Sequence, residues 1–491
     1  MRVSLSNVSP AQARCDVLAI PVAEGGVEGT VAPLDEALGG WIREAAHLSG
    51  FEGKRDRILW LYTHGKLLPP RLLLVGMGRL PSQDAAGWEA LRRAAALAVR
   101  ESRAQGARRL ALWTPGLRPP SVGALVEGLY LGAYRYEAYK AFDEPQVEEA
   151  QILAARSGEA AEALRRARIL AEATCFARDL VNAPPNEMTP PALASVARRI
   201  ARDKDLRVRV YGPAELERMG AGAILAVGGG SKQPPQLIVL DYRPPRARQT
   251  VVLAGKGVTF DAGGLDIKTA EGMETMKSDM AGAAAVWGAM RALADLEVPH
   301  RVVGIVGAVE NLLGEGAFKP GDVVRAMNGK TIEITNTDAE GRVVLADVMS
   351  YAQRYRPDAI VDLATLTGAA MIALGYVAAA IMGNDRGLIQ DLIRAGEVAG
   401  ERLWELPLYE EFREAMRSEV ADLKNSAGRY GGAQKGAAFI GEFVGGRPWA
   451  HLDIAGVAFL DKAEGQAPHL PKGATGFGVR TLLRWLVEAP R

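Results

Sequence analysis

Apolar runs alternate with amphipathic segments over the first part of the chain. Continuous apolar stretches at residues 58–63, 71–78 and 110–114 predict buried strands, and the periodic stretch at residues 88–102 predicts a helix. Strands that alternate with helices are typical of an α/β domain with a largely parallel sheet. This part of the chain shows no catalytic constellation, so we interpret it as a scaffold or a binding module.

The same alternation continues in the second part, where helices are expected near residues 279–296 and 343–355. Residues 363–384 carry no charge and match the ~20 residues of a membrane span, but glycines interrupt them and aspartates flank them. We therefore expect a strand, a short helix and another strand there, all buried in a core. Further strands are expected at residues 208–212, 236–242, 250–260, 300–309, 359–368 and 450–459.

A change in composition marks the junction between the two parts. Residues 136–150 are polar and acidic, a stretch rich in Ala, Leu and Arg at residues 158–180 predicts a long helix, and paired prolines end that helix. The fold expected is two α/β domains with mostly parallel or mixed sheets, joined by the long helix. The expected parts are an N-terminal scaffold domain at 1–150, a connecting helix and Pro-rich linker at 151–185, and a C-terminal catalytic domain at 186–491.

Charge and cysteine content narrow the classes of function. The 491 residues carry 59 Lys and Arg against 58 Asp and Glu, so the basic excess typical of a large nucleic-acid or membrane footprint is missing. An Arg-rich tract at residues 91–109 leaves one alternative open, a DNA-binding or non-catalytic role, although a solvated helix face is favoured. With only Cys15 and Cys175 and no secretory pattern, we expect a cytoplasmic protein without a disulfide framework.

The candidate chemistry depends on carboxylates. The five histidines lack zinc-helix spacing, His451 is interpreted as a core residue or one that supports a ligand, and serine-nucleophile and Walker motifs are absent. Segments 254–285 and 336–348 place polar groups after apolar strands, where open α/β sheets bind ligands. The candidate residues are Lys256, Asp261, Lys268, Asp279, Asp338, Glu340 and Arg342.

Several of these residues also have a purely structural interpretation. Asp279 could cap the helix that follows it, and Asp261 could belong to a turn. Arg342 is harder to explain, because a cation in the first turn of a helix opposes the helix dipole by ~0.3–1 kcal/mol. An anion held by its guanidinium and by the helix N–H groups would account for that placement.

Charge counting favours a metal site. Four carboxylates in one poorly solvated pocket carry −4, and Lys268 and Arg342 reduce this only to −2, which would raise the carboxylate pKa values. Two divalent cations would give +2, and a bridging hydroxide with one bound anion would return the pocket to neutrality. Ions such as Mn²⁺, Mg²⁺, Zn²⁺ and Co²⁺ suit oxygen ligands of this kind.

The same segments carry a more specific resemblance. The motif NTDAEGR at residues 336–342 resembles the leucyl aminopeptidase family of cytosolic di-metal exopeptidases. The family's other motifs match in the same order and extend the similarity from about residue 179 to the C-terminus. These motifs are RDLVNAPPNEMTP, GKGVTFDAGGLDIK, MKSDMAGAAA, DLATLTGA and HLDIAG.

The resemblance implies two adjacent metal ions, Mn²⁺ or Zn²⁺, with Mg²⁺ and Co²⁺ as further choices. Asp261 and Glu340 would bridge the two ions. Asp338 would complete one site, and Lys256 with Asp279 would complete the other. A lysine ligand must be neutral, and its reference pKa of ~10.4 makes deprotonation at pH 7 cost about 4.6 kcal/mol without a metal or strong desolvation.

The resemblance also implies the remaining roles. A water between the metals would attack the first peptide carbonyl, Lys268 would stabilise the developing oxyanion, and Arg342 would hold a bicarbonate ion as general base. The substrates would be peptides with a free N-terminus and a preferred Leu-like first residue. The side-chain pocket would be formed by Met276, Asn336, Thr365 and Gly368, with Leu366 near the anion.

Two further expectations follow from the resemblance. The family usually assembles as a homohexamer, and we expect the same here. Residues 434–436, Gln-Lys-Gly, depart from the small hydroxyl-bearing stretch usual in relatives, on the far side of the substrate cleft. A third option, a di-metal phosphatase, is disfavoured because the sequence shows no further basic clamp for phosphate.

Overall fold

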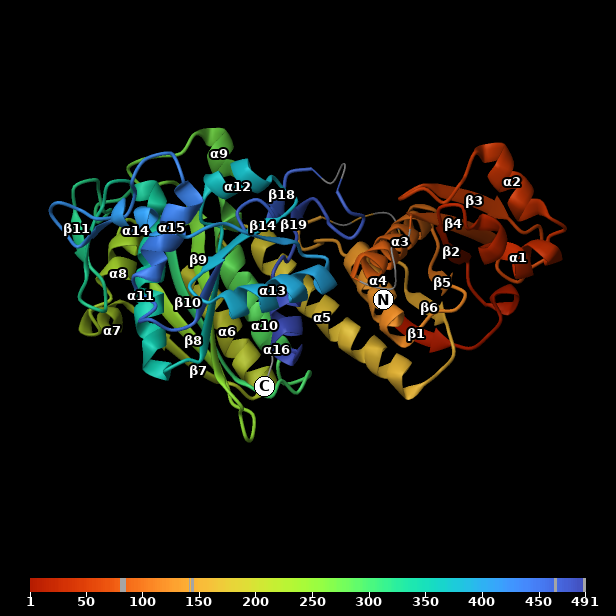
Figure 1. Cartoon of the computed structure of the whole chain (residues 1–491), viewed down its shortest axis with the longest axis horizontal. Helices are drawn as coiled ribbons and strands as arrows, with labels where there is room; N and C mark the ends of the chain where they lie inside the picture. Colours follow the sequence, from red (N-terminus) through yellow and green to blue (C-terminus); the bar gives the residue numbers. More distant parts are fainter. Residues whose placement is uncertain (80–84, 141, 143–144, 463–465, 489–491) are drawn as a thin grey trace. The chain divides into compact units, whose positions relative to one another are not determined.

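The chain folds as two α/β units, each built around one large sheet (Figure 1). The computed structural model describes residues 1–79, 85–140, 142, 145–462 and 466–488. Unit 1 comprises Met1–Cys175, Val398–Gly400 and Lys462–Pro471, and unit 2 comprises Phe176–Glu397, Glu401–Asp461 and Lys472–Arg491. The expected α/β class is confirmed.

Unit 1 contains a six-stranded sheet in the order β1-β6-β5-β2-β4-β3, in which only β3 pairs antiparallel. Strands β2 and β4 are buried on both faces, which explains their continuous apolar sequence. The strands are β1 Arg2–Ser6, β2 Val17–Ala23, β3 Ile58–Tyr62, β4 Arg71–Gly78, β5 Arg109–Trp113 and β6 Glu149–Leu153. The helices are α1 Val27–Ala37, α2 Trp41–Ser49, α3 Ala85–Ala104 and α4 Pro119–Ala133, with the short η1 Pro10–Gln12.

The Arg-rich tract at residues 91–109 covers most of α3, the following turn and the first residue of β5. Arg92 is buried, and three further arginines of the tract are also paired with carboxylates. The pairs are Arg92–Glu127, Arg93–Asp56, Arg108–Glu148 and Arg109–Asp16. Much of the tract's positive charge is thus compensated within the unit, which gives no support to the nucleic-acid alternative.

The expected long helix is present as α5, Gly158–Asn182. The last strand of the first sheet, β6, spans residue 150, and the division between the two units falls inside α5, between Cys175 and Phe176. Strand β6 lies between β1 and β5 and pairs in parallel with both, so it stays with the N-terminal residues although the acidic, polar composition begins before it.

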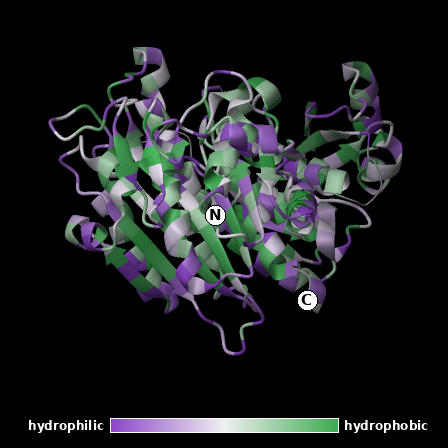
Figure 2. Cartoon of the chain, turned by 60° about the vertical axis from the view of Figure 1, so that its left-hand side comes forward, coloured by the Kyte–Doolittle hydropathy of each residue, from purple (hydrophilic) through white to green (hydrophobic). Residues whose placement is uncertain are grey.

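Unit 2 contains an eight-stranded mixed sheet in the order β15-β14-β17-β13-β9-β10-β8-β7. Its four central strands, β17, β13, β9 and β10, run parallel. Figure 2 shows that the strands are largely apolar. The strands are β7 Arg207–Tyr211, β8 Gln236–Tyr242, β9 Thr250–Asp261, β10 Arg301–Asn311, β13 Ala359–Ala364, β14 Ala379–Gly383, β15 Leu403–Glu405 and β17 Trp449–Asp453. Each strand expected from the sequence in this unit is present, but the expected strands 359–368 and 450–459 end early, at Ala364 and Asp453.

Helices and two small sheets complete unit 2. A three-stranded sheet joins β11 Val323–Arg325, β12 Thr331–Glu333 and β16 Leu423–Lys424, and β18 Phe459–Leu460 pairs with β19 Gly473–Ala474. The helices are α6 Pro190–Lys204, α7 Pro213–Arg218, α8 Gly222–Gly228, α9 Ala270–Glu274, α10 Ala281–Ala292, α11 Glu340–Ala352, α12 Gly368–Leu374, α13 Arg386–Ala399, α14 Glu410–Glu414, α15 Gly432–Gly441 and α16 Val479–Glu488. The short helices are η2 Met276–Met280, η3 Thr337–Ala339 and η4 Gln353–Tyr355.

The uncharged stretch 363–384 forms the expected strand, short helix and strand, as the end of β13, α12 and β14. The expectation that all of it is buried is wrong, because Ile372 is 85% exposed and Val377 is 61% exposed. The two strands are buried almost throughout, whereas Ala370 is the only residue of α12 that is buried. Among the described residues, no helix is both long and apolar enough to cross a membrane.

Helix α11 is anchored by a buried carboxylate. Asp347 is fully buried and accepts hydrogen bonds from the backbone N–H groups of Ile224 (2.9 Å) and Met327 (2.7 Å). Burial raises the pKa of the Asp347 carboxyl to about 7, although these backbone donors oppose the shift. Asp347 therefore links α11 to α8 and to the turn after β11 through hydrogen bonds. Keeping its carboxylate ionised in this buried place costs folding free energy.

This placement predicts a pH dependence of stability. Because the Asp347 pKa is raised on folding, the native state binds more protons than the unfolded state between pH 4 and 7, and stability falls as pH rises through that window. We expect the unfolding free energy of wild type, relative to Asp347→Asn, to fall by about 3 kcal/mol between pH 5 and pH 8.

Urea unfolding at the two pH values measures this difference. Asp358→Asn is the matched control, since Asp358 also accepts a backbone hydrogen bond, from Thr250 (2.8 Å), but at an exposed position. A constant difference between wild type and Asp347→Asn across that pH range would contradict the assignment.

Candidate functional site

The candidate site lies where the parallel strands of unit 2 end. Asp261 is the last residue of β9, and the segment 365–367 follows the neighbouring strand β13 directly. Glu340 is the first residue of α11, and Asp338 lies in the short turn η3 before it. The carboxyl ends of parallel strands meet at one edge of a sheet, so residues distant in sequence converge there.

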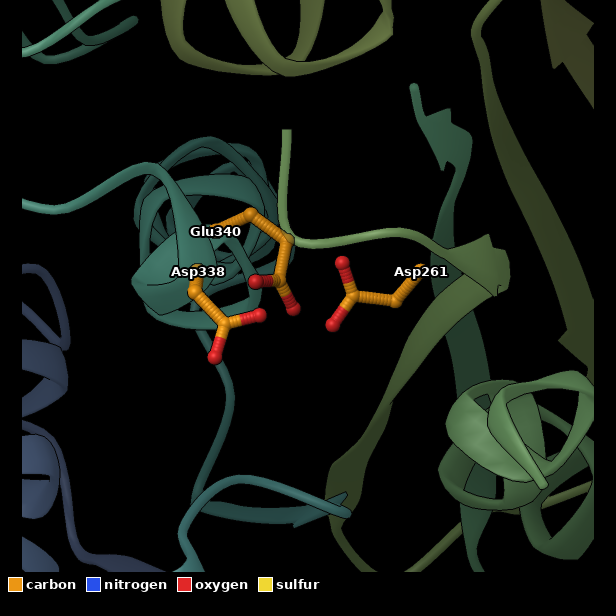
Figure 3. Close-up of side chains that lie close together, drawn as sticks. All are labelled: Asp261, Asp338 and Glu340. Carbon is orange, nitrogen blue, oxygen red and sulfur yellow. The ribbon is translucent and has the colours of Figure 1, made fainter. Parts of the chain in front are cut away.

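Three carboxylates face one another at this edge (Figure 3). Asp261, Asp338 and Glu340 each offer an oxygen, and these oxygens lie within 4.8 Å of one another. Asp261 and Glu340 are buried, whereas the Asp338 side chain is 35% exposed. The structure thus brings together three of the carboxylates that the sequence analysis singled out.

Lys256 brings the fourth carboxylate into the cluster. Its Nζ lies 2.8 Å from Asp279 Oδ1, 2.8 Å from Glu340 Oε1 and 3.1 Å from the carbonyl oxygen of Thr365. Burial would lower the pKa of the Lys256 ammonium, but the neighbouring carboxylates outweigh this and raise the pKa. Asp279 does not cap α10, so the structural interpretation of this aspartate is wrong.

Lys268 pairs with the other side of the cluster. Its Nζ lies 2.8 Å from Asp261 Oδ2 and also contacts Asp338 Oδ1. Burial opposes the charge of Lys268, yet the carboxylates raise its pKa, so it remains a cation. Asp261 serves partly as a turn residue as well, because its Oδ1 accepts the N–H of Gly263 (2.8 Å).

The carboxylates themselves are poorly solvated. Burial raises the pKa of Asp279, Glu340 and Asp338, and their mutual repulsion adds to this, while Lys256 and Lys268 oppose it. Asp279 Oδ2 and Glu340 Oε2 are buried and have no hydrogen-bond partner among the described residues. Unpaired buried carboxylate oxygens beside an amine are a donor set that fits divalent metal ions.

Two glycines allow this close packing. A Cβ on Gly341 would lie 2.5 Å from Lys256 Cε, so the lysine reaches the cluster only because residue 341 has no side chain. Gly263 adopts φ +89°, and a Cβ there would lie 2.9 Å from Asp338 Oδ1. The backbone around the carboxylates therefore leaves little freedom for them to separate.

Arg342 lies in the first turn of α11, two residues after Glu340. The residue is only 8% exposed, its Nη1 donates to the carbonyl oxygen of Asn425 (3.0 Å), and its Nε has no partner among the described residues. Burial lowers the pKa of the Arg342 guanidinium. A Cβ on Gly436 would lie 2.9 Å from Leu366 Cδ2 and 3.4 Å from Arg342 Nη2, so these three residues are close neighbours.

The residues expected to form the substrate pocket lie on segments that border the cluster. Thr365 donates through Oγ1 to Asp279 Oδ1 (2.8 Å), and Leu366 and Gly368 follow it before and at the start of α12. Asn336 caps η3 through its Oδ1, and Met276 begins η2, the short helix that carries Asp279. Their grouping in one pocket stays a prediction.

Buried polar residues that the sequence analysis did not identify support this arrangement. Asn311 donates to Asp261 Oδ1 (2.8 Å), and Asp453 accepts from the Oγ1 of Thr367 (2.6 Å) and from the N–H of Leu366 (3.2 Å). Both residues end strands of the central sheet, beside β9 and β13, so their strand-end positions could have identified them.

His451 is a buried core residue, in agreement with its interpretation from the sequence. Its Nδ1 lies 2.7 Å from Asp362 Oδ1, while Trp449 Nε1 donates to the other oxygen of the same carboxylate (2.7 Å). The Asp362 carboxylate raises the pKa of His451, although burial of the imidazole opposes this. These residues form a polar layer within the sheet next to the segment held by Asp453.

Comparisons with known proteins agree with the geometry. Residues 175–483 match the cytosol aminopeptidase family, catalytic domain, and residues 19–142 match the N-terminal domain of the same family. A probable cytosol aminopeptidase of Roseiflexus castenholzii is 46% identical, with 99% of each chain covered. A probable cytosol aminopeptidase of Geotalea uraniireducens is also 46% identical, with 96% of each chain covered.

Solved structures show the same similarity. The bottromycin maturation enzyme BotP in complex with Mn is 40% identical, with a TM-score of 0.85 and coverage of 96% of this chain and 98% of that one. A mutant of tomato leucine aminopeptidase is 33% identical, with a TM-score of 0.88 and coverage of 99% and 96%. The resemblance noted in the sequence is confirmed, and the chain belongs to the cytosol aminopeptidase family of peptide hydrolases.

Proposed function

We propose that the protein is a metal-dependent aminopeptidase that removes an N-terminal residue, preferably apolar and Leu-like, from peptides. The observation that carries the proposal is the buried carboxylate cluster with two unpaired oxygens, on Asp279 and Glu340. Cations stabilise buried carboxylate oxygens of this kind. Four carboxylates are enough to supply oxygen ligands to two divalent ions. The Mn named with BotP makes Mn²⁺ the first choice, with Zn²⁺, Mg²⁺ and Co²⁺ as alternatives.

Five side chains would hold the two ions. Asp261 and Glu340 lie between the two sides of the cluster and would bridge, Asp338 would complete one site, and Lys256 with Asp279 would complete the other. When bound, the ions would supply Lewis acidity and a water of lowered pKa. Lys256 would release its proton on binding, since only the neutral amine has a lone pair to donate.

Lys268 would act on the substrate rather than on the metals. Its side chain is 17% exposed, so one part of the ammonium can reach a bound peptide while it contacts Asp261 and Asp338. A raised pKa keeps Lys268 charged at neutral pH. A fixed cation beside the peptide carbonyl would stabilise the oxyanion that develops there.

Arg342 would hold a bicarbonate ion that accepts the proton from the attacking water. Its buried guanidinium has an Nε donor without a partner among the described residues, and the first turn of α11 adds backbone N–H groups. An anion there would pair a charge that is otherwise costly to bury. Bicarbonate has the size and basicity for this role.

The substrate side chain would lie against Met276, Asn336, Thr365 and Gly368, with Leu366 toward the anion. The thioether of Met276 and the small Gly368 suit an apolar side chain. We further propose that the enzyme acts in the cytoplasm as a homohexamer on peptides with a free N-terminus.

Metal removal and one ligand variant test the core of this proposal. Dialysis against a chelator should abolish hydrolysis of leucine amide, and added Mn²⁺ should restore it. Asp338→Ala should lower kcat by about 100-fold, because one metal loses a ligand. The matched control is Asp391→Ala on α13, where the carboxylate pairs with Arg394 on the same helix. Activity that survives chelation would refute the proposal.

Bicarbonate dependence tests the role of Arg342 separately. In buffer depleted of carbon dioxide, wild type should respond to added bicarbonate, whereas Arg342→Ala should be about 100-fold slower and should not respond. Arg354→Ala, an exposed arginine just after the same helix, should behave as wild type. An equal response to bicarbonate in Arg342→Ala and wild type would show that the anion binds elsewhere or not at all.

A further inference from the structure

A single buried amide connects the ligand segment 335–342 to a distant part of the chain. Asn425 follows strand β16, which pairs in parallel with β12, and its side chain is fully buried. The backbone N–H of Asn425 extends this pairing by donating to the carbonyl oxygen of Glu333 (2.9 Å). The backbone leaves β12 at this point and turns toward the carboxylate cluster.

Beyond the end of the strand pairing, the Asn425 side chain forms hydrogen bonds with the segment that follows β12. Its Oδ1 accepts the N–H groups of Thr335 (2.8 Å) and Asn336 (3.3 Å). Its Nδ2 donates to the carbonyl oxygens of Asn336 (2.6 Å) and Ala339 (3.4 Å). Its own carbonyl oxygen accepts Nη1 of Arg342 (3.0 Å). One residue thus contacts four positions of an eight-residue segment.

We propose that Asn425 is a positioning residue, which sets the geometry of the metal ligands Asp338 and Glu340 and of the anion-binding Arg342. This inference rests on the proposed function, since it concerns the same ligands. Asp338 lies between the two carbonyl groups that Asn425 holds, and Glu340 follows the second of them. A shift of the segment would therefore move both carboxylates relative to Asp261 on β9.

Only a carboxamide can make this set of bonds. A buried carboxylate accepts hydrogen bonds but donates none, so Asp at position 425 would face the carbonyl oxygens of Asn336 and Ala339 without a proton between them. An aliphatic side chain would leave the N–H and carbonyl groups of the segment unpaired. Strand pairing cannot replace the amide, because Asp338 and its neighbours form the turn η3 rather than a strand.

The position of segment 335–342 also affects the position of Lys256. Gly341 packs directly on the Lys256 side chain, and Lys256 in turn contacts Asp279. A displaced segment would therefore disturb both halves of the proposed metal site. Effects of residues that support metal ligands are commonly about 10–100-fold in metal affinity.

Titration of the metal-free protein with Mn²⁺, followed by calorimetry, tests the inference without an activity measurement. Asn425→Asp should bind Mn²⁺ about 10–100-fold more weakly than wild type. Asn384→Asp is the matched control, because Asn384 also bridges a backbone carbonyl, of Arg447 (2.8 Å), and an N–H, of Trp449 (2.8 Å), in the same unit. That control should bind Mn²⁺ as wild type does.

Hydrogen exchange provides a second measurement, and its first part uses the wild-type protein alone. In the wild-type protein the amides of Thr335 and Asn336 should exchange slowly, although Thr335 itself is exposed, because Asn425 accepts both. In Asn425→Ala, exchange at residues 335–342 should rise, while β9 remains protected. Free exchange of both amides in wild type would overturn the inference even if neither variant folded.

The outcomes separate this inference from the function on which it rests. Equal Mn²⁺ affinity of Asn425→Asp and wild type would overturn the positioning role and leave the proposed function intact. Absence of Mn²⁺ binding by wild type, with a positive control for the calorimetry, would overturn both. Weaker binding by Asn425→Asp together with an unchanged Asn384→Asp supports the positioning role.

Discussion

Mutual repulsion among four carboxylates is the constraint on which the site depends. Asp261, Asp279, Asp338 and Glu340 share a space from which water is largely excluded, and burial together with repulsion from neighbouring carboxylates raises the pKa of Asp279, Asp338 and Glu340. The structure holds them together with the ammonium groups of Lys256 and Lys268. Two lysines leave a net charge of −2, and the unpaired carboxylate oxygens mark the places where further positive charge would be stabilised.

The sheet provides the rigidity that this arrangement needs. Strands β9 and β13 are neighbours in register, so the end of one and the segment after the other are at fixed spacing. Two glycines pack so closely that no side chain would fit, and this also limits movement. Gly341 packs on Lys256, and a Cβ on Gly282 would lie 2.0 Å from the carbonyl oxygen of Leu363. Close backbone packing of this kind keeps like charges together where a flexible loop would let them separate.

Buried polar side chains extend the rigid region into the connecting segments. Asn311 orients Asp261, Asp453 holds the segment after β13, and Asn425 holds the segment before α11. Each comes from a different part of the chain and satisfies backbone or carboxylate groups that would otherwise be buried unpaired. The catalytic proposal and the positioning role of Asn425 therefore describe one network, in which ligand geometry depends on residues that touch no substrate.

The sequence alone predicted the α/β class and most strands and helices, because apolar periodicity is a local property. It also singled out Asp261, Asp338 and Glu340, through their positions after apolar strands, the charge count and the motif NTDAEGR. It did not reveal the burial of Arg92, the exposure of Ile372 or the bonds of Asn425. Composition around the first two residues suggested a solvated helix face and a buried stretch, and composition around Asn425 gave no sign of its bonds. Only the tertiary structure decided these three features. Burial and hydrogen bonding depend on segments far away in the chain, and a local sequence pattern does not identify those segments.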